Sequence, residues 1–212
     1  MKTTISILII YSLICGSASS RSGEHKLLLS PENNKRALIQ RIYTAELGVK
    51  EKTGKNDGPR VEQYLRQVGL KRGDPWCAAF VCWVFDQAGV ANPRTGWSPG
   101  LFPKGKLIWE RKEVVGGRVA GEKVAGAVAG EKVAVGRKAV KSLPQRGDVF
   151  GIWFPEKNRI AHAGFVDRWD KSWLITVEGN TNEAGSREGD GVLRKRRLVR
   201  SVYQVVKWVI RE

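Results

Sequence analysis

Residues 74–85 read Asp74-Pro75-Trp76-Cys77-Ala78-Ala79-Phe80-Val81-Cys82-Trp83-Val84-Phe85. Asp74 is a good N-cap, and Pro75 suits the first helical position, where a missing N–H costs nothing. The helix that follows is apolar on every side, which predicts that it lies in the middle of the domain. Cys77 then falls in the first turn, where unpaired N–H groups and the helix dipole favour a negative charge. Such surroundings can lower the pKa of a thiol from about 8.5 to roughly 3.5–7.5, which makes the thiolate an activated nucleophile.

The spacing of apolar residues differs on the two sides of this helix. Before it, helical spacing predicts one helix from Asn33 to Gly48 and a second that follows Pro59 and ends near Gly69. After Gly147 the period changes to two, which predicts strands near 148–154, 160–167, 173–178, 191–198 and 203–210. Helices followed by antiparallel strands predict an α+β fold, with the cysteine-bearing helix packed centrally on an antiparallel sheet.

A cysteine nucleophile needs a base, and the chain has only two histidines. His25 lies in a polar leader, residues 21–32, so by elimination the candidate base is His162. It stands in a predicted strand among small residues that leave room for close approach. A lone histidine in a strand is more often structural than catalytic. The presence of a cysteine at a helix start favours the catalytic interpretation.

The base must in turn be oriented by a third group. Strand alternation puts Glu178 and Asn180 on one face, and both side chains can accept a hydrogen bond from an imidazole. Glu178 lies within an apolar run, where a carboxylate without a donor partner is costly. We therefore expect Glu178 to orient His162, with Asn180 as the alternative or as a supporting residue.

Other residues give weaker signals. Asn56, Asp57 and Trp76 are candidates for lining a groove, although turn chemistry explains the first two equally well. Trp97, Trp109 and Trp153 can contact sugar or peptide, but core packing is the stronger interpretation. The run Arg194-Lys195-Arg196-Arg197 is interpreted as a solvated strand edge. No group of cysteines and histidines has zinc spacing, and no metal or organic cofactor is expected.

The first twenty residues predict export. Lys2 precedes a ten-residue apolar run, and small residues follow it, as in a secretory signal peptide over 1–20. A lipoprotein signal modified on Cys15 is the weaker alternative, because bulky Ile14 precedes that cysteine. The apolar run is short for a membrane span, and no later segment is apolar enough for one. The localisation expected is therefore secreted, periplasmic or in the cell envelope.

Charge and cysteine usage add to this prediction. The net charge is +16, and removal of residues 1–20 takes away one lysine, which leaves about +15. Such a charge indicates an anionic partner, and export favours an anionic cell-wall surface over nucleic acid, which is not expected.

Cys77 and Cys82 stand about 500° apart around a helix and cannot bridge each other. Burial as a small hydrophobe explains Cys82, but it explains a first-turn cysteine less well.

Residues 111–141 fit neither half of the chain. The sequence Ala-Gly-Glu-Lys-Val-Ala occurs at 120–125 and again at 129–134. Eight Lys or Arg against three Glu give this stretch a charge of +5. We interpret it as an inserted basic, low-complexity loop or hairpin that adds affinity for the wall, with a neutral spacer as the alternative.

Five segments, taken in order, resemble the CHAP family of cysteine- and histidine-dependent amidohydrolases and peptidases. They are 56–59 (Asn-Asp-Gly-Pro), 73–81 around Cys77, 146–149 (Arg-Gly-Asp-Val), 161–164 around His162, and 178–180 (Glu-Gly-Asn). The resemblance covers roughly 45–208, so residues 33–212 are expected to form one CHAP-like, papain-like catalytic domain. The insertion at 111–141, placed between the cysteine helix and the first strand, departs from the family pattern and puts substrate access in question.

The resemblance implies a secreted peptidoglycan hydrolase that cleaves the glycan–peptide amide or a bond within the stem peptide. Cys77 would be the nucleophile, His162 the base and Glu178 the orienting residue, in a protein expected to be a monomer. One alternative is a non-catalytic cationic module that binds the cell wall. Another is a secreted antibacterial toxin with the same chemistry.

A deletion tests the role of the insertion. Because residues 115–140 contain no large apolar side chain, we expect their removal to preserve folding and to lower binding to anionic walls. Co-sedimentation with wall material measures this binding. The difference from the intact chain should fade as the screening length falls from about 30 Å at 0.01 M salt to about 10 Å at 0.1 M. An unfolded deletion variant would show instead that the segment belongs to the core.

Overall fold

The computed structural model describes residues 30–111, 114–115, 118–119, 142–184 and 188–210. The expected signal peptide at 1–20 lies outside these ranges. So do nearly all of the polar leader and most of the 111–141 insertion. No helix within the described ranges is both long enough and apolar enough to cross a membrane.

In the described part of the chain, three α-helices precede the main sheet: α1 (Pro31–Ala45), α2 (Pro59–Gln67) and α3 (Cys77–Gln87). The first begins two residues earlier than expected, because the Ser30 hydroxyl accepts a hydrogen bond from the Asn33 amide and caps the helix. The expected cap of α3 is wrong. Trp76 occupies the N-cap position without a side-chain hydrogen bond, while Asp74 accepts from the Lys71 amide and closes a turn.

Six antiparallel strands form one sheet in the order β1-β8-β4-β5-β6-β7. They are β1 (Leu107–Glu110), β4 (Val149–Phe154), β5 (Arg159–Trp169), β6 (Trp173–Thr181), β7 (Gly191–Leu198) and β8 (Gln204–Val206). A separate hairpin pairs β2 (Val114–Val115) with β3 (Arg118–Val119). Four short 3-10 helices lie between strands or before β1: η1 (Ser98–Leu101), η2 (Lys104–Lys106), η3 (Pro155–Lys157) and η4 (Val199–Ser201).

The α+β class and the antiparallel sheet are confirmed, and the five expected strands are all present. The unexpected strand is β1, which is only four residues long and pairs with β8 almost a hundred residues later. Local periodicity over four residues carries too little signal to reveal such a pairing. The insertion therefore follows the first strand, and the expectation that it would precede that strand was wrong.

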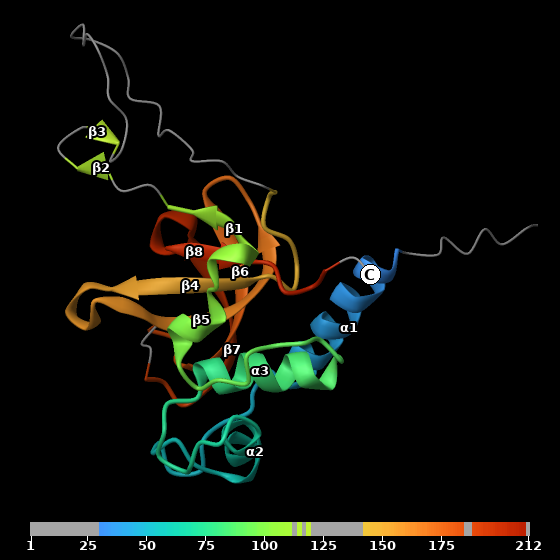
Figure 1. Cartoon of the computed structure of the whole chain (residues 1–212). Coiled ribbons are helices and arrows are strands. Elements are labelled where there is room, and N and C mark those ends of the chain that lie inside the picture. Colours follow the sequence, from blue (N-terminus) through green and yellow to red (C-terminus); the bar gives the residue numbers. More distant parts are fainter. Residues whose placement is uncertain (1–29, 112–113, 116–117, 120–141, 185–187, 211–212) are drawn as a thin grey trace, which may run out of the picture.

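The cysteine helix lies at the centre, as its apolar sequence predicted. Residues 77–85 are all buried, and α3 lies between the sheet and α2 (Figure 1). Phe80 and Phe85 both meet the ring of Phe165 on β5 edge to face. The next residue, Val166, belongs to a second apolar cluster with Phe150. Adjacent strand residues point to opposite faces, so the sheet has a core on each side.

Charged groups lie both inside the fold and at its ends. Arg36 of α1 is 5% exposed and bonds Glu32 Oε1 at 3.0 Å and Asp148 Oδ1 at 2.9 Å. This cluster ties α1 to the start of β4.

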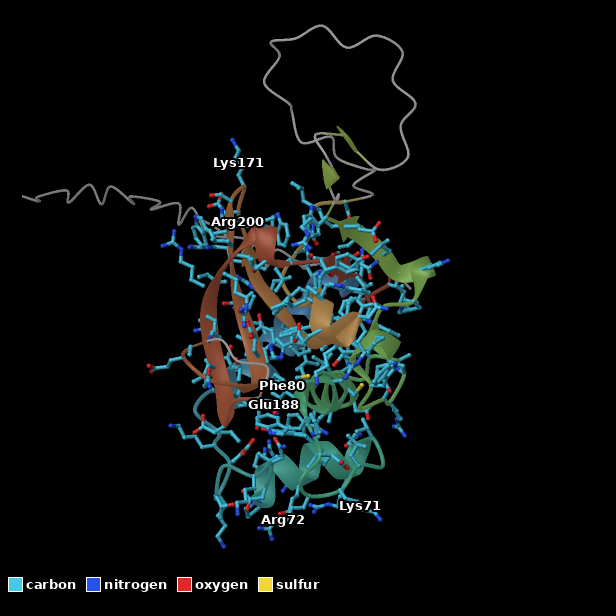
Figure 2. The ribbon with its side chains drawn as sticks, turned by 90° about the vertical axis from the view of Figure 1, so that its left-hand side faces the viewer. Lys71, Arg72, Phe80, Lys171, Glu188 and Arg200 are labelled. Atoms are coloured by element: carbon cyan, nitrogen blue, oxygen red, sulfur yellow. The ribbon has the colours of Figure 1, made fainter. Side chains whose placement is uncertain are left out.

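On the surface, Arg72 lies at one end of the molecule and Arg200 at the other (Figure 2). Exposed positive charge is therefore not confined to one end.

Replacing Arg36 tests the buried cluster. Arg36→Leu leaves the buried Asp148 carboxylate without its cation, so the free energy of unfolding should fall by about 3 kcal/mol. The control is Arg66→Leu, because Arg66 also pairs with a glutamate one helical turn away but is exposed. Its loss should change stability by less than about 0.5 kcal/mol. Urea denaturation measures both, and equal losses would show that Arg36 contributes no more than a surface arginine.

Candidate active site

Cys77 is the first residue of α3, so its sulfur lies beside backbone N–H groups that have no partner within the helix. The residue is only 4% exposed. Its Sγ lies 3.5 Å from the Oγ of Ser98, the first residue of η1. A partly polar, buried position at a helix start suits a thiolate better than it suits a structural thiol.

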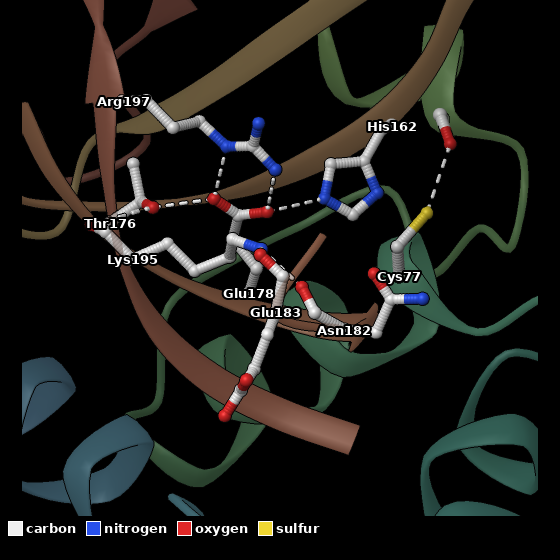
Figure 3. Close-up of polar contacts among 9 residues, drawn as sticks. Cys77, His162, Thr176, Glu178, Asn182, Glu183, Lys195 and Arg197 are labelled. Carbon is white, nitrogen blue, oxygen red and sulfur yellow. Dashed lines mark hydrogen bonds and ion pairs between the residues drawn. The ribbon is translucent and has the colours of Figure 1, made fainter. Parts of the chain in front are cut away.

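His162 comes to this cysteine from the middle of β5 and is 1% exposed. Its Nε2 lies 2.8 Å from Oε2 of Glu178. Its Nδ1 makes no hydrogen bond with any described residue, and Figure 3 shows this edge of the ring turned toward the Cys77 sulfur. One ring nitrogen is therefore held by a carboxylate, and the other is left facing the thiol.

Glu178 has no exposed surface, yet both of its oxygens are bonded. Arg197 of β7 donates from Nε to Oε1 at 2.5 Å and from Nη2 to Oε2 at 2.6 Å. The Thr176 hydroxyl donates to Oε1 at 2.5 Å. Burial alone raises the pKa of this carboxyl, but the bonds from Arg197 and His162 outweigh burial and hold the pKa well below its usual range. Glu178 is therefore an ionised carboxylate.

The thiol and the imidazole shift each other's pKa. Burial by itself raises the pKa of Cys77, but the neighbouring His162 outweighs it and lowers that pKa to about 7. Burial lowers the pKa of His162, whereas Cys77 and Glu178 raise it to about 9. The two shifts have opposite directions, and both favour a thiolate–imidazolium pair over a neutral thiol and imidazole.

Arg197 is a site residue that sequence reasoning missed, because the run 194–197 was interpreted as a solvated edge. The structure corrects this: Arg194 and Arg196 are exposed, whereas the side chain of Arg197 is 13% exposed. The reason is strand alternation, which turns every second residue of β7 inward. The signal that could have revealed it was the need of a buried Glu178 for a donor on a neighbouring strand.

Asn180 does not contact His162. Its Nδ2 donates to the Asn56 Oδ1 at 3.1 Å. The strand pairing slips between Glu178 and Thr181, and Asn180 takes a left-handed backbone with φ of 55°. Alternation therefore fails at this residue, which is why the two side chains that the sequence placed on one face have different partners.

The three groove candidates have other partners. Asn56 donates from Nδ2 to the Gly73 carbonyl and accepts from Asn180, so it ties the segment before α3 to the end of β6. Asp57 is buried and accepts hydrogen bonds from Thr53 within its turn and from Arg72 in the segment before α3. Trp76 is buried and donates from Nε1 to Glu51. Asp57 and Trp76 therefore have structural partners in this arrangement, and Asn56 is linked through Asn180 to the end of β6.

A buried Cys–His–carboxylate row at a helix start has the parts of a nucleophile, a base and an orienting group. Ser98 adds a hydroxyl beside the sulfur, and no sequence signal placed it there, because it lies at the start of η1, 21 residues after Cys77. Comparisons with family models, with curated proteins and with solved structures found no match. The chemistry that this site supports is therefore inferred from its geometry and from the sequence motifs.

A pH titration separates Glu178 from Asn180. Glu178→Gln keeps the size of the side chain but removes the charge that stabilises the imidazolium, so the pKa of Cys77 should rise by about one unit. Asn180→Ala should leave it unchanged, since Asn180 bonds Asn56 instead. The rate of alkylation of Cys77 by iodoacetamide, followed against pH by peptide mass, measures this pKa. Cys82 serves as an internal control, because burial raises its pKa to about 11. A shift in the Asn180 variant alone would contradict the assignment.

Proposed function

We propose that this chain is a cysteine hydrolase that cleaves an amide bond by papain-like acyl transfer. The observation that carries the proposal is the row in which Glu178 Oε2 lies 2.8 Å from His162 Nε2 while the opposite ring edge faces Cys77. The pKa of Cys77, lowered to about 7, adds that the nucleophilic form is available near neutral pH. Cys77, His162 and Glu178 each have one role. In the described part of the chain, no second histidine could take the role of the base.

The reaction follows from these positions. His162 takes the thiol proton on Nδ1, and Glu178 keeps Nε2–H oriented and stabilises the imidazolium. The thiolate attacks the amide carbonyl, and N–H groups of the first turn of α3 stabilise the oxyanion. The imidazolium then gives its proton to the leaving amine, which leaves a thioester on Cys77. Water, deprotonated by His162, attacks the thioester and releases the acid and the free thiol.

The proposed substrate is peptidoglycan, cleaved either at the glycan–peptide amide or within the stem peptide. Three features of the sequence support it: the resemblance to the CHAP family, the signal-like residues 1–20, and the net charge of +16. We accordingly place the protein outside the cytoplasm, in the envelope or beyond it, with an anionic wall as its surface partner.

A cationic module that binds the wall without cleaving it is the second candidate, because charge alone gives wall affinity. Such a module does not need a buried carboxylate that orients a histidine. Arg197, Thr176 and His162 all bond Glu178, and an arrangement of this kind favours catalysis over simple adhesion.

Removal of the nucleophile tests the proposed function. Cys77→Ala should lower release of fragments from purified peptidoglycan by more than about a thousandfold and leave wall binding intact. The control is Cys82→Ala, because the Cys82 thiol is buried in the core and donates to the Thr95 carbonyl, so it should be dispensable for turnover. Mass analysis of the fragments identifies the bond that is cleaved. Near-wild-type release by the Cys77 variant would exclude the cysteine mechanism.

A further inference from the structure

The surface next to Cys77 carries an exposed tryptophan. The sulfur itself is covered, and Ser98 contacts it from η1. Trp97, the preceding residue, is 55% exposed. Among the described residues it is the only aromatic side chain in the group of exposed large hydrophobics, whose other members are Leu143, Leu198 and Ile210. Core packing, the stronger expectation for this residue from sequence, was wrong.

An arginine lies on this tryptophan. The guanidinium carbon of Arg159 is 4.1 Å from the centre of the Trp97 ring. Arg159 is the first residue of β5, the strand that carries His162. Its Nη1 donates to the carbonyl of the adjacent Ile160 at 3.2 Å. Within the described ranges it forms no ion pair with a carboxylate.

Two other arginines with partly or largely buried side chains have acidic partners. Arg60 also stacks on a tryptophan, Trp83, but it pairs with Glu46. Arg197 pairs with Glu178. Arg159 is therefore a cation that stacks on the residue before Ser98 and lies on the strand that carries His162, with edge N–H groups that no described carboxylate occupies.

The chemistry of the pair indicates its ligand. A guanidinium that stacks with its face on an aromatic ring keeps the N–H groups at its edge free for a carboxylate, which they bind in a bidentate way. Peptides supply carboxylates at their C-termini and on acidic side chains. The exposed indole face beside it can cover apolar parts of the same ligand.

We propose that Trp97 and Arg159 form a carboxylate-binding subsite of the active site. The substrate class it selects is an amide with a free carboxylate near the bond that Cys77 attacks. This substrate role rests on the proposed function. The affinity of the subsite for carboxylates does not, and it can be measured without any hydrolysis.

The test compares two alkylating reagents of similar size. Iodoacetate carries a carboxylate and iodoacetamide does not, so the ratio of their rates at Cys77 reports the local preference for an anion. Changes in thiolate fraction or in access affect both reagents and cancel in this ratio. Reaction at Cys77 in the full chain is followed by peptide mass.

Arg159→Gln should lower the iodoacetate-to-iodoacetamide ratio by up to about fivefold, the effect of losing one partly exposed charge pair. Arg159→Lys, which keeps the charge, should retain most of the ratio. The matched control is Arg168→Gln, because Arg168 stacks on Trp173 at 4.6 Å in the same manner but away from Cys77. An unchanged ratio in Arg159→Gln, or an equal fall in Arg168→Gln, would overturn the subsite.

A second measurement separates the subsite from the proposed hydrolase. Paired peptide amides that carry either a carboxylate or a carboxamide beside the scissile bond are compared by KM. In the wild type the carboxylate form should have the lower KM, and Arg159→Gln should remove the difference with little change in kcat. If the wild type cleaves neither peptide nor peptidoglycan while the alkylation ratio responds, the hydrolase fails and the subsite stands. If it cleaves both peptides with equal KM and the ratio does not respond, the subsite fails and the hydrolase stands.

Discussion

A carboxylate with no exposed surface needs donors for both of its oxygens, and Glu178 finds them on three adjacent strands. His162 reaches it from β5, Thr176 from its own strand β6, and Arg197 from β7. Without these donors the charge would be expelled to water or neutralised by a proton. The register of three strands and the orientation of the imidazole are therefore set by one buried charge. The site needs that orientation, because the ring edge that Glu178 does not hold is the one that faces Cys77.

The second constraint is the helix that brings the cysteine. The sequence of α3 is apolar all round, so the helix is stable only when it is covered on every side, by the sheet, by α1 and by α2. Cys77, the first residue of α3, is then fixed where the helix meets β5, and it is held as rigidly as the core around it. The same burial leaves Cys77 only 4% exposed. Under the proposed function, a substrate would have to reach this covered sulfur beside Ser98, which contacts it and follows the exposed Trp97.

Alternation along strands explains both a success and a failure of prediction. It puts Glu178 on the face of the histidine, where the apolar run around it favoured it over Asn180, and it also turns Arg197 inward. It fails at Asn180, where the backbone adopts φ of 55° and the pairing with β7 slips. A left-handed residue changes the direction of the side chains that follow it in the strand. The local pattern of apolar residues gives no sign of such a break.

The sequence by itself determined the α+β class, the approximate limits of three helices and five strands, and the pair Cys77 and His162. Each of these depends on local periodicity or on the scarcity of a residue type, both of which can be read along the chain. The tertiary structure alone decided that Arg197 holds Glu178, that Asn180 bonds Asn56, that β1 completes the sheet, and that Ser98 lies beside the thiol. Those contacts join residues that are distant in sequence or that follow a local break in the backbone. Their geometry depends on strand register and on the packing of α3, which no single segment encodes.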